Sequence, residues 1–177
     1  NDKDESNDIG RTPLHVAALE GNEEVVRLLL MEGADHEKVD KRGNSVLHAA
    51  ASGGSVEIVR LLLSQGKDIH EPNEAGQTPL HLAALEDKVE VVRILLKEGA
   101  DKKKVDKHGN SVLHAAVCGG GVELVKLLLN HVRDASELPE RRKQESPAQV
   151  AEEKRKEEVV RPPPTQPPPP PPAPAKR

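Results

Sequence analysis

At positions 78–84 the chain reads Thr78-Pro79-Leu80-His81-Leu82-Ala83-Ala84, and this pattern returns at a fixed interval. Thr12-Pro13-Leu14-His15 lies 66 residues earlier, and two related stretches that begin with Ser45 and Ser111 lie midway. The four histidines that end these stretches are therefore 33 residues apart. A period of about 20 to 50 residues is the signature of a stacked repeat protein, so this repeat governs every local interpretation.

The period, the Thr-Pro-Leu-His tetrapeptide and the Ala-Ala pair after it resemble ankyrin repeats, over residues 7–131. The resemblance implies an all-α solenoid in which each repeat is a β-turn followed by an antiparallel helix pair. We expect a frayed lead-in at 1–6 and four repeats at 7–39, 40–72, 73–105 and 106–133. We expect a charged linker at 134–160, helical and solvated or docked as a cap, and a disordered, polyproline II tail at 161–177.

Local signals predict where the helices of a repeat begin and end. Thr12 is expected at the N-cap, with Pro13 at the first helical position, where its missing N–H costs nothing. This helix should end at Leu19 or Glu20, and a second helix should cover about 23–32. Its broad apolar face is expected to contain Val25, Val26, Leu28, Leu29 and Leu30.

Small or short polar residues mark the turns between these helices. Gly10 and its equivalents Gly43, Gly76 and Gly109 are expected to take positive φ angles. Asp87 replaces the glycine found at positions 21, 54 and 120, and aspartate tolerates left-handed geometry better than most residues. We therefore expect the third repeat to keep the same turn.

A second period of 66 residues lies over the first, because residues 12–63 and 78–129 are identical at 38 of 52 positions. The chain thus resembles a duplicated pair of repeats. After Leu129 the pattern fails, and the last helix has no following repeat in the sequence. Val122, Leu124 and Val125 are therefore expected to need cover from elsewhere.

Composition narrows the function. The net charge is −4 and the chain has no Phe, Tyr or Trp, which argues against nucleic-acid binding by basic patches and base stacking. There is no apolar run of about 18 residues and no signal peptide, so we expect no membrane insertion. The single cysteine, Cys118, fits an intracellular, reducing compartment, cytoplasmic in the first instance with the nucleus left open.

The sequence gives no reason to expect an enzyme. Histidines that recur once per repeat, about 10 Å apart, cannot share an ion at His–Zn distances of about 2 Å, so a structural role is expected and no metal site. In ankyrin repeats this histidine makes hydrogen bonds between adjacent turns. No cluster of nucleophile, base and orienting group stands out, so no catalytic residue and no cofactor is predicted.

The resemblance implies that partners bind the turn tips and the exposed side of the first helices. Carried over position by position, the tip residues are Ile9, Arg11, Lys41, Arg42, Asn44, Glu74, Gln77, Lys107, His108 and Asn110. The first-helix positions are Leu19, Ser52, Leu85 and Cys118. Charges of successive tips alternate in sign, which predicts a ladder of ion pairs; ordinary solvated charges are the alternative.

The tail carries a second candidate site. Arg161 with Pro164 and Pro167 resembles a ligand of SH3 domains, and Pro171, Pro174 and Lys176 give the reverse orientation. The proline runs also resemble ligands of WW, EVH1 and profilin domains. A semi-rigid spacer explains the same composition, because any proline tract contains this spacing.

The sequence thus predicts a non-catalytic scaffold or adaptor that binds a protein on its tips and concave first-helix face. The alternative is a structural module that stacks end to end through its uncovered last repeat. We expect a monomer in preference to an oligomer.

Overall fold

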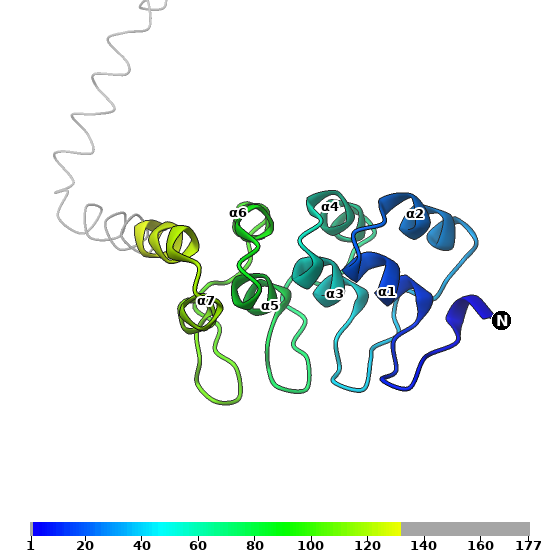
Figure 1. Cartoon of the computed structure of the whole chain (residues 1–177), viewed down its shortest axis with the longest axis horizontal. Coiled ribbons are helices and arrows are strands. Elements are labelled where there is room, and N and C mark those ends of the chain that lie inside the picture. The colour runs from blue at the N-terminus through cyan, green and yellow to red at the C-terminus, as the bar shows by residue number, and fades with distance from the viewer. Residues whose placement is uncertain (1, 132–177) are drawn as a thin grey trace, which may run out of the picture. The chain divides into compact units, whose positions relative to one another are not determined.

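The computed structural model describes residues 2–131, which form two rows of helices joined by long loops (Figure 1). A single 3-10 turn, η1 (Asp2–Asp4), comes first. The first helices of the repeats are α1 (Pro13–Leu19), α3 (Val46–Gly53), α5 (Pro79–Leu85) and α7 (Val112–Gly119). The second helices are α2 (Glu23–Met31), α4 (Val56–Ser64) and α6 (Val89–Lys97), and residues 122–131 are helical in the fourth repeat.

This part of the chain is an all-α solenoid, as predicted. Each first helix packs against the first helix of the next repeat, α1 on α3, α3 on α5 and α5 on α7. The second helices form the other row, with looser contacts between α2, α4 and α6. Residues 2–131 contain no sheet, and their one isolated bridge pairs Val105 with Ser111 beside the fourth tip.

The helices begin where the capping residues predict. The side chains of Thr12, Ser45 and Ser111 each accept a hydrogen bond from the backbone N–H of the histidine three residues later. That histidine returns the bond, because its Nδ1 accepts from the N–H of the capping residue. This is a capping box in which histidine takes the place usually held by Glu or Gln.

The predicted turn geometry is also present. Asp87 has a φ of 54°, the only positive value at a non-glycine residue among those described. At Gly10 and Gly43 the tip of the next repeat comes so close that a Cβ would lie 2.8 Å from the backbone nitrogens of Lys41 and Glu74, respectively. Glycine is therefore required at these two positions both by φ and by space.

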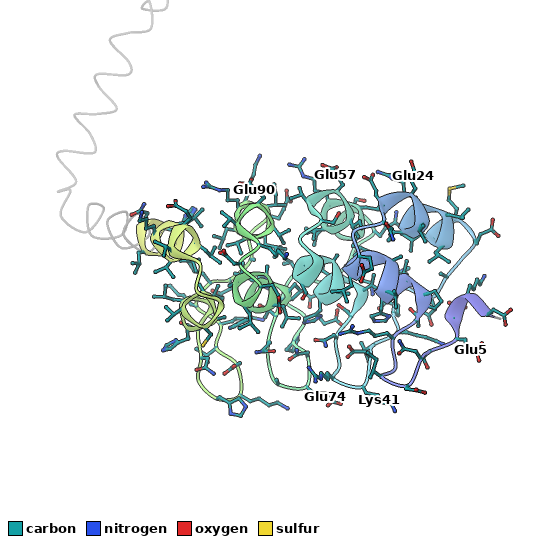
Figure 2. The ribbon with its side chains drawn as sticks, viewed as in Figure 1. Glu5, Glu24, Lys41, Glu57, Glu74 and Glu90 are labelled. Atoms are coloured by element: carbon teal, nitrogen blue, oxygen red, sulfur yellow. The ribbon has the colours of Figure 1, made fainter. Side chains whose placement is uncertain are left out.

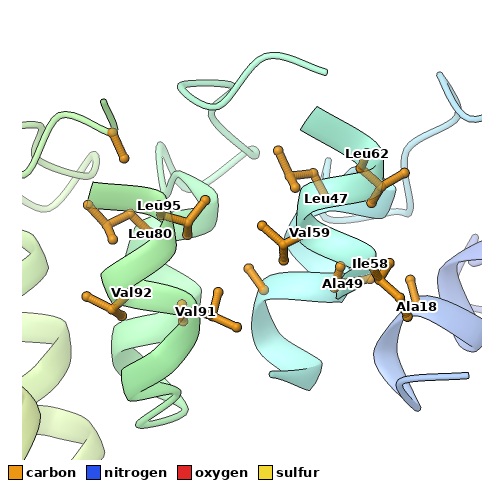
Figure 3. Close-up of a cluster of buried hydrophobic side chains, with 14 of the residues drawn as sticks. Ala18, Leu47, Ala49, Ile58, Val59, Leu62, Leu80, Val91, Val92 and Leu95 are labelled. Carbon is orange, nitrogen blue, oxygen red and sulfur yellow. The ribbon is translucent and has the colours of Figure 1, made fainter. Parts of the chain in front are cut away.

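Aliphatic side chains alone fill the core between the two rows (Figure 3). Leu47 and Leu80 from the first helices, with Val59 and Val92 from the second, are fully or almost fully buried. Burying a side chain of this size contributes about 1.5–3 kcal/mol. Small alanines at the junctions let neighbouring first helices approach closely. Because the helices are this close, aliphatic side chains are large enough to fill the core without aromatic residues.

Two expectations about apolar faces were wrong. Val25 and Leu28 are exposed, although Ile58 and Val91, the equivalents of Val25 in later repeats, are buried. No repeat precedes the first one within the described residues, so nothing covers this side of α2. Conversely, Leu124 is fully buried and Val125 half-buried without a following repeat among the described residues, whereas Val122 is exposed as expected.

The lead-in is more ordered than the predicted frayed segment. The N–H of Asp35 donates to Asp4 Oδ1 at 2.7 Å, and Lys38 Nζ donates to the Asp4 carbonyl at 2.8 Å. Asp2 lies 33 residues before Asp35, so these residues are in phase with the end of a repeat. They therefore pack on the first repeat as the last segment of a repeat packs on the next.

His15 and His48 each connect their own helix cap with the neighbouring repeat. Nδ1 of His15 accepts from the Thr12 N–H, so the ring hydrogen is on Nε2, which donates to the Asn44 carbonyl at 3.1 Å. His48 does the same with the Gln77 carbonyl at 3.0 Å. Nε2 of His81 is buried without a hydrogen bond of ordinary geometry among the described residues.

These contacts require a neutral ring, because a proton on Nδ1 would face the N–H of the cap. Burial lowers the pKa of His15, His48 and His81, against a smaller opposing effect of the backbone carbonyls that accept from the ring or lie near it. The hydrogen bonds of the rings and their lowered pKa values are both consistent with the predicted structural role of these histidines.

The lowered pKa values predict a fold that weakens in mild acid. Unfolded histidines bind protons as the pH falls through about 6.5, while the buried rings stay neutral, so stability is full above 6.5 and is lost below it. Each of the three rings should reduce the free energy of unfolding by at most about 1.4 kcal/mol per pH unit below that value. Urea unfolding at pH 7.5, 6.5 and 5.5 measures this.

His48→Gln should lower stability at pH 7.5 and flatten the pH dependence, whereas exposed His108→Gln should change neither. The carboxyl groups with lowered pKa values, Asp40, Asp106 and Glu37, stabilise the fold above about pH 4.5, and this contribution is lost only as the pH falls below that value, outside the range tested. Equal stability at the three pH values would contradict a neutral, buried histidine at the repeat junctions.

Candidate functional site

Each turn tip is organised by the first residue of its repeat. Asp40 Oδ1 accepts from the backbone N–H of Arg42 and of Asn44, both at 2.9 Å, and Oδ2 accepts from Asn44 Nδ2 at 3.0 Å. The Oδ1 atoms of Asn7, Asn73 and Asp106 accept two backbone N–H groups in the same way. A short side chain that closes its own turn fixes the tip without other support.

Backbone hydrogen bonds then join the tips to one another. Lys41 N–H donates to the Ile9 carbonyl at 3.1 Å, Glu74 N–H to the Arg42 carbonyl at 2.9 Å, and Lys107 N–H to the Ala75 carbonyl at 2.9 Å. Lys41 and Glu74 consequently lie along one edge of the array, opposite Glu24, Glu57 and Glu90 on the second helices (Figure 2). The tips therefore present one continuous edge.

Asp40 also anchors a charge beside the first helices. Burial by itself would raise the pKa of Asp40, but hydrogen bonds from Asn44 and Arg42 and the charge of Arg11 outweigh it, so the pKa is lowered. Arg11 Nε lies 3.6 Å from Asp40 Oδ2. Asp40 thus stays ionised and holds the Arg11 guanidinium at the mouth of the space between tips and helices.

A groove of about 520 Å³ lies in this space and spans the first three repeats. Its apolar floor comes from the exposed side of α1, α3 and α5, and its walls come from the tips. Eight of the predicted partner-binding residues line it, namely Arg11, Leu19, Arg42, Asn44, Ser52, Glu74, Gln77 and Leu85.

The other six predicted residues do not line this groove. They are Ile9, Lys41, Lys107, His108, Asn110 and Cys118, all of them exposed. Lys107, His108, Asn110 and Cys118 belong to the fourth repeat, beyond the end of the groove. Ile9 and Lys41 lie at the outermost part of the tip, joined through the backbone. As part of a binding surface, these six remain a prediction.

Sequence reasoning missed several groove residues. Ala49, Leu82 and Glu86 line the groove with the predicted helix positions. Leu82 lies three residues before Leu85 and so shares its helix face, and Glu86 follows Leu85 directly. The helical spacing was a signal that could have identified Leu82, because a pair at i and i+3 is exposed on the same side.

Charge is distributed unevenly around the groove. Arg11 and Arg42 lie on the tips of the first two repeats, and Glu74 and Glu86 belong to the third. Between residues 2 and 131, the predicted ladder of ion pairs is reduced to one pair between successive tips, Arg11 with Asp40. Lys38 and Lys104 donate instead to the carbonyl oxygens of Asp4 in the lead-in and of His70 in the preceding repeat. Arg42, Glu74 and Lys107 are exposed and face solvent or a partner.

Two further observations apply to residues 2–131 alone. No three side chains of His, Cys, Asp or Glu come together there as a metal site. Every helix of this part is too short or too polar to span a bilayer. The predicted proline-rich ligand, with Arg161, Pro164, Pro167, Pro171, Pro174 and Lys176, lies outside the described residues, as does the linker at 134–160.

Comparison with known families agrees with this geometry. A family model described as ankyrin repeats (3 copies) matches residues 1–40, 21–106 and 67–137, which together cover most of the chain. A search among curated proteins gives no match. The 33-residue period and the stacked helix pairs agree with this match, and the chain therefore belongs to the ankyrin repeat family.

Proposed function

We propose that this protein is a non-catalytic scaffold or adaptor whose groove binds a segment of a protein partner. Ankyrin repeats mediate protein–protein interaction, and the observation that carries the proposal is the groove across three repeats, with an apolar floor and charged walls. We place this binding inside the cell, in the cytoplasm or nucleus, where the exposed, free Cys118 would stay reduced.

The floor of the groove indicates what the partner inserts. Ser52 on α3 lies at the position of Leu19 on α1 and Leu85 on α5, and all three line the groove. The serine is smaller than its two neighbours, and from this difference in size we infer a notch in the floor between two leucine side chains. An aliphatic side chain of the partner fits such a notch and would bury apolar surface on both sides.

The walls indicate the charge of the partner on either side of that residue. At one end Arg11 is paired with Asp40, and the exposed Arg42 favours an acidic residue. The carboxylates at the other end, Glu74 and Glu86, favour a basic one. A segment with an acidic, an aliphatic and a basic residue in that order is therefore the best match. Opposite charges at the two ends also fix the direction in which the segment lies.

The stacked repeats contribute by holding these groups in place before binding. Tip loops closed by Asp40 and Asn73, and joined by backbone hydrogen bonds, lose little conformational entropy when a partner arrives. Without aromatic residues in the groove, the affinity must come from aliphatic contact and charge. Leu19, Leu85 and Arg42 are the residues we expect to contribute most.

A display library of peptides selected on the full-length protein tests this proposal. We expect enriched peptides to carry an aliphatic residue between acidic and basic ones, and Ser52→Arg to weaken their binding at least about tenfold by filling the notch. Glu57→Arg on the second-helix side is the matched control and should leave binding unchanged. Titration by calorimetry measures both.

Charge reversal separates this groove from a general electrostatic surface. Arg42→Glu should weaken the same peptides and shift the selected sequences away from acidic residues, whereas Arg60→Glu on α4 should do neither. If the two reversals reduce affinity equally, or if Ser52→Arg has no effect, the groove is not the binding site.

For the tail, we propose a docking segment for a domain that recognises polyproline II, with a spacer as the alternative. The support is the sequence itself, in which Arg161 precedes Pro164 and Pro167 at SH3-ligand spacing. Titration of the full chain with SH3, WW, EVH1 and profilin domains should give at least one complex weakened by a triple change of Arg161, Pro164 and Pro167 to Ala. If none of these domains binds, the tail is better explained as a spacer.

A further inference from the structure

The end of the fourth repeat exposes positions that are buried in every other repeat. Ala18, Ala51 and Ala84 are 0 % exposed at the junction with the following repeat, but Val117 at the same position is 62 % exposed. His114 is exposed as well, although His48 is completely buried. We call His114, Val117 and Val122 the end face; the equivalents of Val122, which are Glu23, Val56 and Val89, are half-buried, and no neighbour covers this face in residues 2–131.

The start of the first repeat exposes the complementary positions. Val25 on α2 is 44 % exposed, whereas Ile58, Val91 and Leu124 at the same position are 0–1 % exposed. Val16 on α1 is exposed too, while the equivalent Ala49 and Ala115 are buried. The start face, defined by Val16, Val25 and Leu28, is therefore the half of a junction that normally receives a preceding repeat.

Unused hydrogen-bond groups on the two faces also match. The Asn44 carbonyl accepts from Asp40 N–H and from His15 Nε2, so it uses both lone pairs. The equivalent carbonyl in the first repeat, on Arg11, accepts only from Asn7 N–H within the described residues. On the end face, Nε2 of His114 makes no hydrogen bond within the same part, and it is the donor that such a carbonyl lacks.

The junction between the second and third repeats supplies the template. There Asn73 Nδ2 donates to Asn44 Oδ1 at 2.9 Å, whereas the first junction pairs Arg11 with Asp40. Because the sequence repeats every 66 residues, Asn110 stands where Asn44 does, and Asn7 stands where Asn73 does. The fourth and first repeats thus carry the two halves of the asparagine pair seen inside the molecule.

The two faces are also in phase along the sequence. Four periods of 33 residues make 132, so residue 2 of a second copy corresponds to position 134 of the first. In the second copy, the turn η1 already fills the place where the last segment of a preceding repeat would pack, through the contacts of Asp4 with Asp35 and Lys38.

We propose that the end face of one copy docks on the start face of a second copy, so that the stack continues head to tail across two molecules. His114 Nε2 would then donate to the Arg11 carbonyl, and Asn7 would pair with Asn110. The contact joins two different faces, so each copy keeps one face available and growth beyond a dimer is expected. This proposal is independent of what the groove binds.

Val117 sets the strength of this contact. It is two carbons larger than Ala51, the residue at the template junction, and extra carbons in a close junction force the packing apart. We therefore expect an association weaker than the internal junctions, visible only at high concentration. Val117→Ala restores the residue of the template and should strengthen self-association.

Sedimentation velocity of the full chain, from about 10 μM to about 1 mM, tests the proposal. The average mass should rise with concentration above that of the 19.2 kDa monomer. Val25→Glu, on the start face, and Val117→Glu, on the end face, should each abolish the rise. Both side chains are exposed in the single copy, so unchanged helix content and melting temperature are expected and should be verified.

A mixture of the two variants distinguishes head-to-tail docking from any other association. Val25→Glu retains a working end face and Val117→Glu a working start face, so the mixture should form a dimer that does not grow further. Met31→Glu is the matched control, because its equivalents Ser64 and Lys97 are exposed inside the array. The proposal would be overturned if the wild-type chain stays strictly monomeric or if the mixture of the two variants does not associate. It would also be overturned if Met31→Glu abolishes association equally.

Discussion

A neutral imidazole hydrogen-bonded at both ring nitrogens is the interaction on which this structure depends. In the first two repeats, Nδ1 accepts from the helix cap and Nε2 donates to a carbonyl of the next repeat, at Asn44 and Gln77. One side chain thus starts its own helix and sets the position of the neighbouring tip. Because a buried polar atom is costly when unpaired, the 33-residue spacing of these two histidines fixes the register of the first three repeats.

Function follows from what this register places side by side. The first helices pack closely through alanines, which brings Leu19, Ser52 and Leu85 into one floor, while the closed tips bring Arg42 and Glu74 above it. The stacking of the repeats, and not an isolated loop, positions each of these residues. Within residues 2–131, the same register leaves Val25 exposed in the first repeat and Val117 exposed in the fourth.

Sequence alone predicted the parts of this structure that local chemistry decides. The caps at Thr12 and Ser45, the bounds of α1 and the left-handed Asp87 all depend on residues within a few positions. Features that depend on neighbouring repeats were harder to predict. The exposure of Val25 depends on whether another repeat covers it, and the groove is lined by residues of the first three repeats without reaching Lys107. The phase of the lead-in was visible at Asp2, but its packing on the first repeat required coordinates.

Nitrogen-15 NMR of the histidine rings at pH 7 tests the central claim most directly. The account predicts that His15 and His48 are neutral with the hydrogen on Nε2, protected from solvent exchange, and coupled through that hydrogen to the carbonyl carbons of Asn44 and Gln77. Rings that are protonated, that carry the hydrogen on Nδ1, or that exchange freely with water would contradict it, and the stacked edge on which the groove depends would have to be abandoned.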